Sequence, residues 1–242
     1  MLERLQTTSG QWVKGQVTGP ISMGLTVVDQ DLRSSLYDEM LVDALVKNAA
    51  VNARWQIKKL KSVRPNIFMF VDEPYMASFG SAFISLSREQ AVTMLDEVFE
   101  SIHNEGGLAG VHCCANTDWS VLLETEVDIL NLDAYGYLDN LALYPDELRA
   151  FLDRGGIIAW GIVPNTEEID NVTPAGLVNQ LRRGIGLICE KAAARGVSID
   201  PDEFNSRSLI TTACGLGPTT PEIADRVIPV LVETGHLLQD DS

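Results

Sequence analysis

Short apolar runs alternate with longer stretches of helical periodicity along this chain. Continuous apolar runs of strand length, bounded by Gly, Pro or polar residues, predict buried β-strands. Six runs fit this description: 12–20, 66–74, 108–113, 128–133, 157–163 and 208–213. Helical patterns cover 36–60, 87–105, 145–154, 173–195 and 220–238. A further short helix is predicted to begin after Thr117 or Asp118.

Local signals predict where these helices begin and end and which side faces the core. Ser87 and Gln90 form an imperfect capping box at the start of 87–105. Pro174 and Gly196 mark the start and the end of 173–195. In 36–60, the periodicity predicts inner faces that carry Met40, Leu41, Ala44, Leu45, Ile57 and Leu60.

The β-α-β rhythm indicates an α/β fold with a parallel sheet covered on both faces. A doubly wound sheet and a (β/α)₈ barrel both fit. The length of 242 residues suits one large α/β domain or two small ones. The chain contains no repeat, low-complexity stretch or convincing linker, and a single domain over 1–242 is predicted. A barrel of this type needs about eight strands, and the sequence offers six.

Polar or reactive residues follow each predicted strand, at the edge where α/β folds bind their ligands. In a strand, alternate side chains share a face, so His112 and Cys114 can point into a site while Cys113 points away. Cys214 follows another strand and can reach the same place. One imidazole and two thiolates suit Zn²⁺ and leave a fourth position for substrate. The alternative is that the cysteines fill the core and His112 is an ordinary histidine.

Three carboxylates also end strands. Asp133 is a candidate fourth metal ligand or an acceptor for the imidazole N–H, and alternatively a helix N-cap. Asp72 and Glu73 are adjacent, so only one of them faces the site in an extended segment. A carboxylate there could bind a substrate ammonium group or act in acid–base chemistry. The alternative is a salt bridge to a neighbouring loop.

Composition narrows the classes of partner and compartment. The 242 residues are 45% hydrophobic, with 18 basic and 34 acidic residues and a net charge of −16. This balance argues against nucleic acid and anionic membrane as partners. No apolar run approaches the roughly 20 residues of a membrane span, and the first residues lack a signal-peptide pattern, so we expect a soluble cytoplasmic protein. The other cysteine and histidines are read as a core residue, Cys189, and as surface residues, His103 and His236.

Six segments, in order and over nearly the whole chain, carry a family resemblance. They are VKGQVTGPIS at 13–22, VDEP at 71–74, GVHCC at 110–114, DILNLDAY at 128–135, GGIIAWGIVP at 155–164 and TTACGLG at 211–217. The chain resembles the C-terminal catalytic barrel of cobalamin-independent methionine synthase. More broadly, it is similar to the superfamily that includes uroporphyrinogen decarboxylase and the corrinoid-linked zinc methyltransferases.

The resemblance implies a TIM-like barrel that lacks the first two strands of the family barrel. It implies a zinc ion that binds a thiol such as homocysteine as the thiolate, which then attacks a methyl group. By position, His112, Cys114 and Cys214 match the zinc ligands, and Asp133 stands where the family has a carboxylate ligand. Asp72 matches the carboxylate that contacts the amino group of homocysteine, which makes it the predicted catalytic residue.

Asp72, Glu73 and Asn165 are the predicted substrate-binding residues. The family has a catalytic histidine after the IIAWG-like strand, where this chain has Val163, Pro164 and Asn165. Arginine- and tryptophan-rich determinants for a polyglutamyl folate are not recognisable, so a methyl-corrinoid protein joins methyl-folate as a candidate donor.

Two other hypotheses remain open at this point. One is a metal-free enzyme similar to uroporphyrinogen decarboxylase, which would need arginines for tetrapyrrole carboxylates. The candidates Arg64, Arg149, Arg182 and Arg183 lie in predicted helices or at their ends, away from the strand ends. The other is an incomplete barrel that becomes active only with a partner chain or with a second copy, because six strands do not close an eight-stranded barrel.

Overall fold

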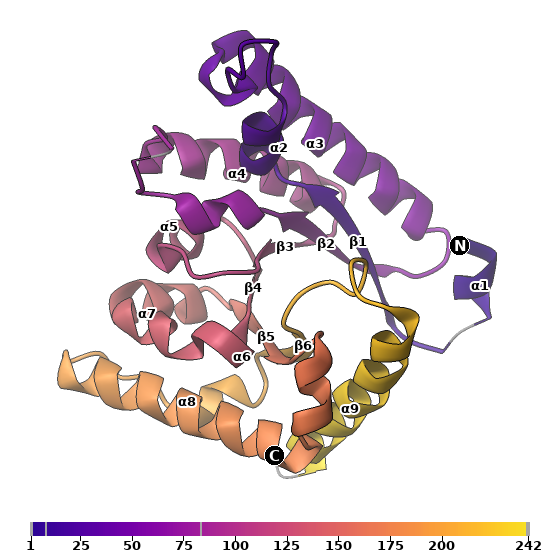
Figure 1. Ribbon diagram of the computed structural model, residues 1–242, viewed down its shortest axis with the longest axis vertical. Helices are drawn as coiled ribbons and strands as arrows, with labels where there is room; N and C mark the ends of the chain where they lie inside the picture. Colours follow the sequence, from indigo (N-terminus) through magenta and orange to yellow (C-terminus); the bar gives the residue numbers. More distant parts are fainter. Residues whose placement is uncertain (1, 8, 83, 241–242) are drawn as a thin grey trace. The chain divides into compact units, whose positions relative to one another are not determined.

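The computed structural model describes residues 2–7, 9–82 and 84–240 of the chain (Figure 1). The strands of this part are β1 (Trp12–Thr18), β2 (Asn66–Asp72), β3 (Leu108–Cys113), β4 (Ile129–Leu132), β5 (Ile157–Val163) and β6 (Ser208–Thr212). Its α-helices are α1 (Leu2–Gln6), α2 (Pro20–Thr26), α3 (Glu39–Leu60), α4 (Arg88–Asn104), α5 (Trp119–Glu124), α6 (Ala134–Tyr137), α7 (Pro145–Asp153), α8 (Pro174–Ala194) and α9 (Pro221–Asp240).

All six predicted strands are present, and the fold is α/β as expected. The strand order is β1-β2-β3-β4-β5-β6, and β1–β2, β2–β3 and β5–β6 pair in parallel. A doubly wound sheet reverses its strand order at one point. The consecutive order therefore excludes that alternative. Six strands are compatible with part of a (β/α)₈ barrel and do not make a complete one.

The chain divides into two compact units. The first comprises the residues up to Cys113 together with Val121–Ile129, and the second comprises Cys114–Ser120 together with the residues from Leu130 onward. The prediction that 1–242 form a single domain stays a prediction.

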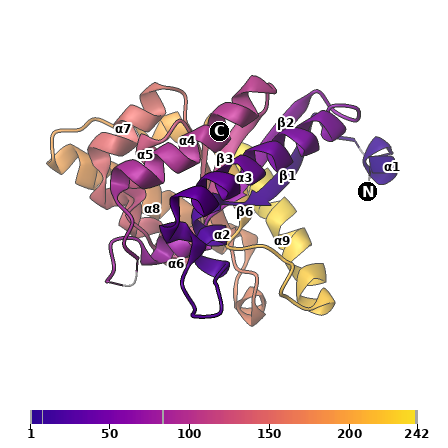
Figure 2. The same cartoon turned by 90° about the horizontal axis from the view of Figure 1, so that it is seen from above.

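In the first unit, α3 and α4 pack against each other and against β1, β2 and β3 (Figure 2). Residues of β1 alternate strictly between buried and exposed, with Val13 and Val17 on the buried side. On the other face of the strands, Trp12 stacks on Phe68 with ring centroids 4.3 Å apart. One face of these strands therefore belongs to the core, and the other carries aromatic and polar side chains.

The predicted inner face of α3 is wrong for three of its residues. Met40 and Leu41 are 80% and 52% exposed, and Ala44 is exposed as well. Ile57 and Leu60 are buried as predicted. The residues that face the core before Ile57 are mostly small: Val46, Ala49, Ala50 and Ala53. The periodicity was misleading because apolar residues lie on both sides of this helix.

In the second unit, α8 and α9 pack against each other and against β5 and β6. The helix signals of α8 are confirmed, since Thr173 is the N-cap, Pro174 comes first and Gly196 has φ +81. Trp160 of β5 is fully buried and donates from Nε1 to Ser208 Oγ at 2.8 Å. This indole therefore ties β5 to β6 as well as filling the core.

The structure also bears on predictions for single cysteine and histidine residues and for short helices. Cys189 is buried, and His103 and His236 are exposed, as expected. The short helix α2 was not predicted, although Pro20 stands at its first position. No helix of the described residues is both long enough and apolar enough to cross a membrane.

Candidate metal centre

The two adjacent cysteines at the end of β3, Cys113 and Cys114, differ in burial. His112 and Cys114 are half-buried, whereas Cys113 between them has no exposed surface. This is the alternation expected of extended backbone, in which neighbouring side chains point to opposite faces. Cys113 is therefore a core residue, and His112 and Cys114 share the other face.

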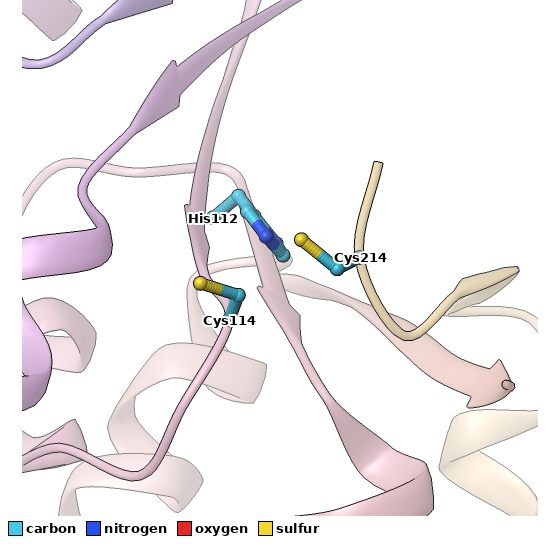
Figure 3. A group of neighbouring side chains, drawn as sticks. All are labelled: His112, Cys114 and Cys214. Atoms are coloured by element: carbon cyan, nitrogen blue, oxygen red, sulfur yellow. The ribbon is translucent and has the colours of Figure 1, made fainter. Parts of the chain in front are cut away.

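His112, Cys114 and Cys214 come together. The Nδ1 or Nε2 atom of His112 and the two Sγ atoms lie within 4.8 Å of one another. Figure 3 shows the three side chains, with the imidazole and the sulfur of Cys214 pointing toward one another. Within the described residues, this is the group of at least three His, Cys, Asp or Glu donors that could hold a metal ion.

The backbone around Cys214 is held by residues of the second unit. Ala213 N donates to Val163 O at 2.8 Å, and Thr212 Oγ1 donates to the carbonyl of Cys214 at 2.6 Å. Asn165 Nδ2 donates to the carbonyl of Gly215 at 3.1 Å. Hydrogen bonds on three consecutive residues fix the direction in which Cys214 leaves β6.

A glycine lets β6 approach this closely. A β-carbon on Gly161 would lie 2.6 Å from Leu132 O and 3.0 Å from both Thr212 O and Ala213 Cα. The pairing of β5 and β6 shifts register between Gly161 and Val163. The bulge and the missing side chain therefore bring the residues before Cys214 against β5.

Asn131 of β4 was missed by the sequence reasoning. It is buried and donates from Nδ2 to Ala159 O at 2.7 Å and to Thr211 Oγ1 at 3.0 Å. It thereby connects β4 with β5 and with β6, which leads to Cys214. The available signal was a polar residue in the middle of an otherwise apolar strand, which needs a buried partner.

Asp72 and Glu73 have different surroundings. Asp72 is the register partner of both Thr18 and His112, so the three side chains share one face of the sheet. Glu73 has no exposed surface, and its backbone N–H donates to the carbonyl of His112 at 2.8 Å. The catalytic and substrate-binding roles of Asp72 stay predictions. The substrate-binding role of Glu73 stays a prediction as well.

The carboxylate of Glu73 is occupied inside the protein. It accepts hydrogen bonds from Ile21 N at 2.9 Å, Ser22 N at 2.7 Å and Ser22 Oγ at 2.6 Å. Burial raises the pKa of Glu73 to about 7, and the hydrogen bonds from Ser22 and Ile21 oppose that rise. A β-carbon on Gly19 would collide with this carboxylate, so the loop after β1 requires glycine.

Asp133 and Asn165 each have a backbone partner. Asp133 is the N-cap of α6, where its Oδ1 accepts from Gly136 N at 2.8 Å. It does not belong to the donor group of His112, Cys114 and Cys214. Its role as a metal ligand stays a prediction, as does substrate binding by Asn165.

The donor set itself indicates what the site can do. Imidazole and thiolate donors favour borderline-soft transition metals over Mg²⁺ or Ca²⁺. Three protein ligands are typical of catalytic sites, in which another position is left for water or substrate.

In comparisons with known proteins, no family model and no curated protein matches the chain.

Proposed function

We propose that this chain is a zinc-dependent methyltransferase that transfers a methyl group to a thiol such as homocysteine. The observation that carries the proposal is the approach of His112, Cys114 and Cys214 to within 4.8 Å. Together they supply the one-imidazole, two-thiolate set that suits zinc. Bound zinc would lower the pKa of a substrate thiol and so supply a thiolate at neutral pH.

Residues around the donor group would orient the substrate. Asp72 shares a face of the sheet with His112, so its carboxylate is suited to an ammonium group beside the reacting thiol. Thr212 and Asn165 hold the backbone at Cys214 and Gly215, and would keep the sulfur of Cys214 in place while substrate enters. Asp133 is proposed as a further, exchangeable ligand.

The consecutive strand order supports the finer description of the fold as part of a TIM-like barrel. Such barrels carry their active sites at the C-terminal ends of the strands, which is where His112 and Cys114 lie. The methyl donor is proposed to be a methyl-corrinoid protein or a methyl-folate. An incomplete barrel that requires a partner chain is the second candidate, and it is favoured by the count of six strands in the described residues.

Zinc content is the first test. The purified protein is expected to bind about one zinc ion per chain, and Cys214→Ser should lose it because a neutral hydroxyl is a poor replacement for a thiolate ligand. Cys189→Ser is the matched control, since Cys189 is a buried cysteine of α8 outside the donor group. Elemental analysis after dialysis measures both. Protein that neither contains zinc nor takes it up on reconstitution would contradict the metal site.

Methyl transfer is the second test. Zinc-loaded protein is incubated with methylcobalamin and homocysteine, and methionine is measured by mass spectrometry. We expect product with the wild type and with Cys189→Ser, and none with Cys214→Ser. A zinc-loaded wild type that forms no methionine from either methylcobalamin or methyl-folate would contradict the proposed reaction while leaving the metal site intact.

A further inference from the structure

The outward side of α3 carries several exposed apolar residues among its polar ones, whereas the exposed side of a surface helix is normally polar. Val51 and Trp55 are 61% and 59% exposed, and Leu41 is more than half exposed. Figure 1 shows α3 at the outside of the first unit. At the end of this helix, Trp55 and Lys59 line a cavity together with Leu2 and Glu3 of α1. Exposed tryptophan within an apolar stripe is typical of an interaction surface.

The spacing of this stripe indicates a partner helix. Leu41, Ala44, Asn48, Val51, Trp55 and Lys58 follow one another at alternating intervals of three and four residues. Those intervals are the a and d positions of heptads, which form the narrow contact seam of paired helices.

The charges along α3 indicate the direction of that partner. Asp38, Glu39 and Asp43 lie at the beginning of the helix, and Lys58, Lys59 and Lys61 lie at its end. A parallel copy would bring like charges together. An antiparallel copy brings the acidic end of each helix beside the basic end of the other. A twofold rotation axis relates these two contacts, so both form in the same dimer.

We propose that two copies of this chain form a twofold-symmetric dimer through antiparallel packing of α3 on α3. In the register centred on the helix, Trp55 of one copy lies opposite Ala44 of the other, and Val51 lies opposite Asn48. A large side chain thus meets a small one where Trp55 faces Ala44, and Leu41 at one end of the seam faces Lys58 of the other copy. Lys61 of each copy lies opposite Asp38 of the other. This interface is independent of the metal site.

A single helix pair lies at the small end of specific interfaces, so a dissociation constant in the micromolar range is expected. Analytical ultracentrifugation of the full chain over micromolar concentrations measures it. Trp55→Glu should raise the dissociation constant by at least about thirtyfold, as expected when a charge replaces a tryptophan that is buried in an interface. Val232→Glu in α9 is the matched control, because Val232 is similarly exposed at 50% and lies outside the seam, and its dissociation constant should stay unchanged.

A charge variant tests the direction of packing. Lys59→Glu with Lys61→Glu puts acidic residues at both ends of α3, so the dimer should weaken, and added salt should weaken the wild-type dimer as well. A wild type that remains monomeric at all concentrations would overturn the proposal, including the case in which another polypeptide segment covers the stripe. A dimer that Val232→Glu disrupts as strongly as Trp55→Glu would overturn it too.

Discussion

The two longest helices of the units, α3 and α8, bury their faces differently. They have 22 and 21 residues. The buried side of α8 carries large residues such as Leu177, Leu181 and Ile188, and no large apolar residue of this helix is exposed. The buried side of α3 contains three alanines, whereas Val51 and Trp55 point outward. A helix with one apolar face identifies its core side, and a helix with two does not.

The largest expected effect separates the two faces of α3. Ile57 is fully buried, so Ile57→Ala should lower the free energy of unfolding by about 2–5 kcal/mol through lost burial and a cavity. Val51→Ala on the outward face should change it by less than about 0.5 kcal/mol in the monomer. Urea unfolding of Trp55→Glu backgrounds, which are expected to be monomeric, measures both. Equal losses from the two changes would break the distinction between the faces.

Two glycines of α8 allow a closely packed position and an open position to be compared within a helix that has a single apolar face. A β-carbon on Gly184 would collide with Leu138, whereas one on Gly186 meets nothing within 4 Å. Gly184→Ala should therefore cost about 1–3 kcal/mol through overpacking. Gly186→Ala should gain up to about 1 kcal/mol, since alanine is the better helix former. Thermal and urea unfolding of the two variants decide, and stabilisation by Gly184→Ala would refute the close packing.

The smallest expected effect on stability concerns side-chain hydrogen bonds in the segments that follow α3 and α8. After α3, Arg64 donates to the backbone carbonyls of Leu5 and Gly10. After α8, Glu203 forms a two-bond ion pair with Arg149 at 2.7 and 2.8 Å. These hydrogen bonds from Arg149 lower the pKa of Glu203 from 4.5 to about 2. The unfolded chain thus takes up the proton first as the pH falls.

The contribution of Glu203 should therefore be complete above pH 4.5 and lost as the pH falls toward about 2. The difference in urea midpoint between the wild type and Glu203→Gln should shrink over this range. Glu190→Gln, on the exposed side of α8, is the control for the loss of one negative charge. A difference that stays constant with pH would contradict the role of the ion pair.

The strands could be predicted from the sequence because each is a short apolar run with Gly, Pro or polar residues at its ends. The caps of α8 were predictable for the same local reason. The core face of α3 was not, because Ala49, Ala50 and Ala53 give a weak apolar signal beside Leu41 and Trp55. Only the packing partner, which lies far away in sequence, decides which side is covered.

The candidate site divides in the same way. The choice of Cys114 over Cys113 follows from strand alternation and needs no tertiary information. The hydrogen bonds that hold the strand leading to Cys214 could not be predicted in this way, because Asn131 contacts Thr211 across 80 positions of sequence. The different fates of Asp72 and Glu73 also depend on Ile21 and Ser22, about fifty residues earlier. Local pattern thus indicates ligand types, and long-range contacts determine how each ligand is held.

The buried carboxylate of Glu73 also acts as a check on strand alignment. If β2 slipped by one residue, its side chains would exchange faces. Asp72 would then be turned toward Ser22 with a shorter side chain, and Glu73 would be turned toward His112. The loop after β1 has no β-carbon at Gly19, and the carboxylate of Glu73 fills the space that this leaves. A misaligned form would lose the three hydrogen bonds that Glu73 accepts and would therefore be less stable than the native alignment.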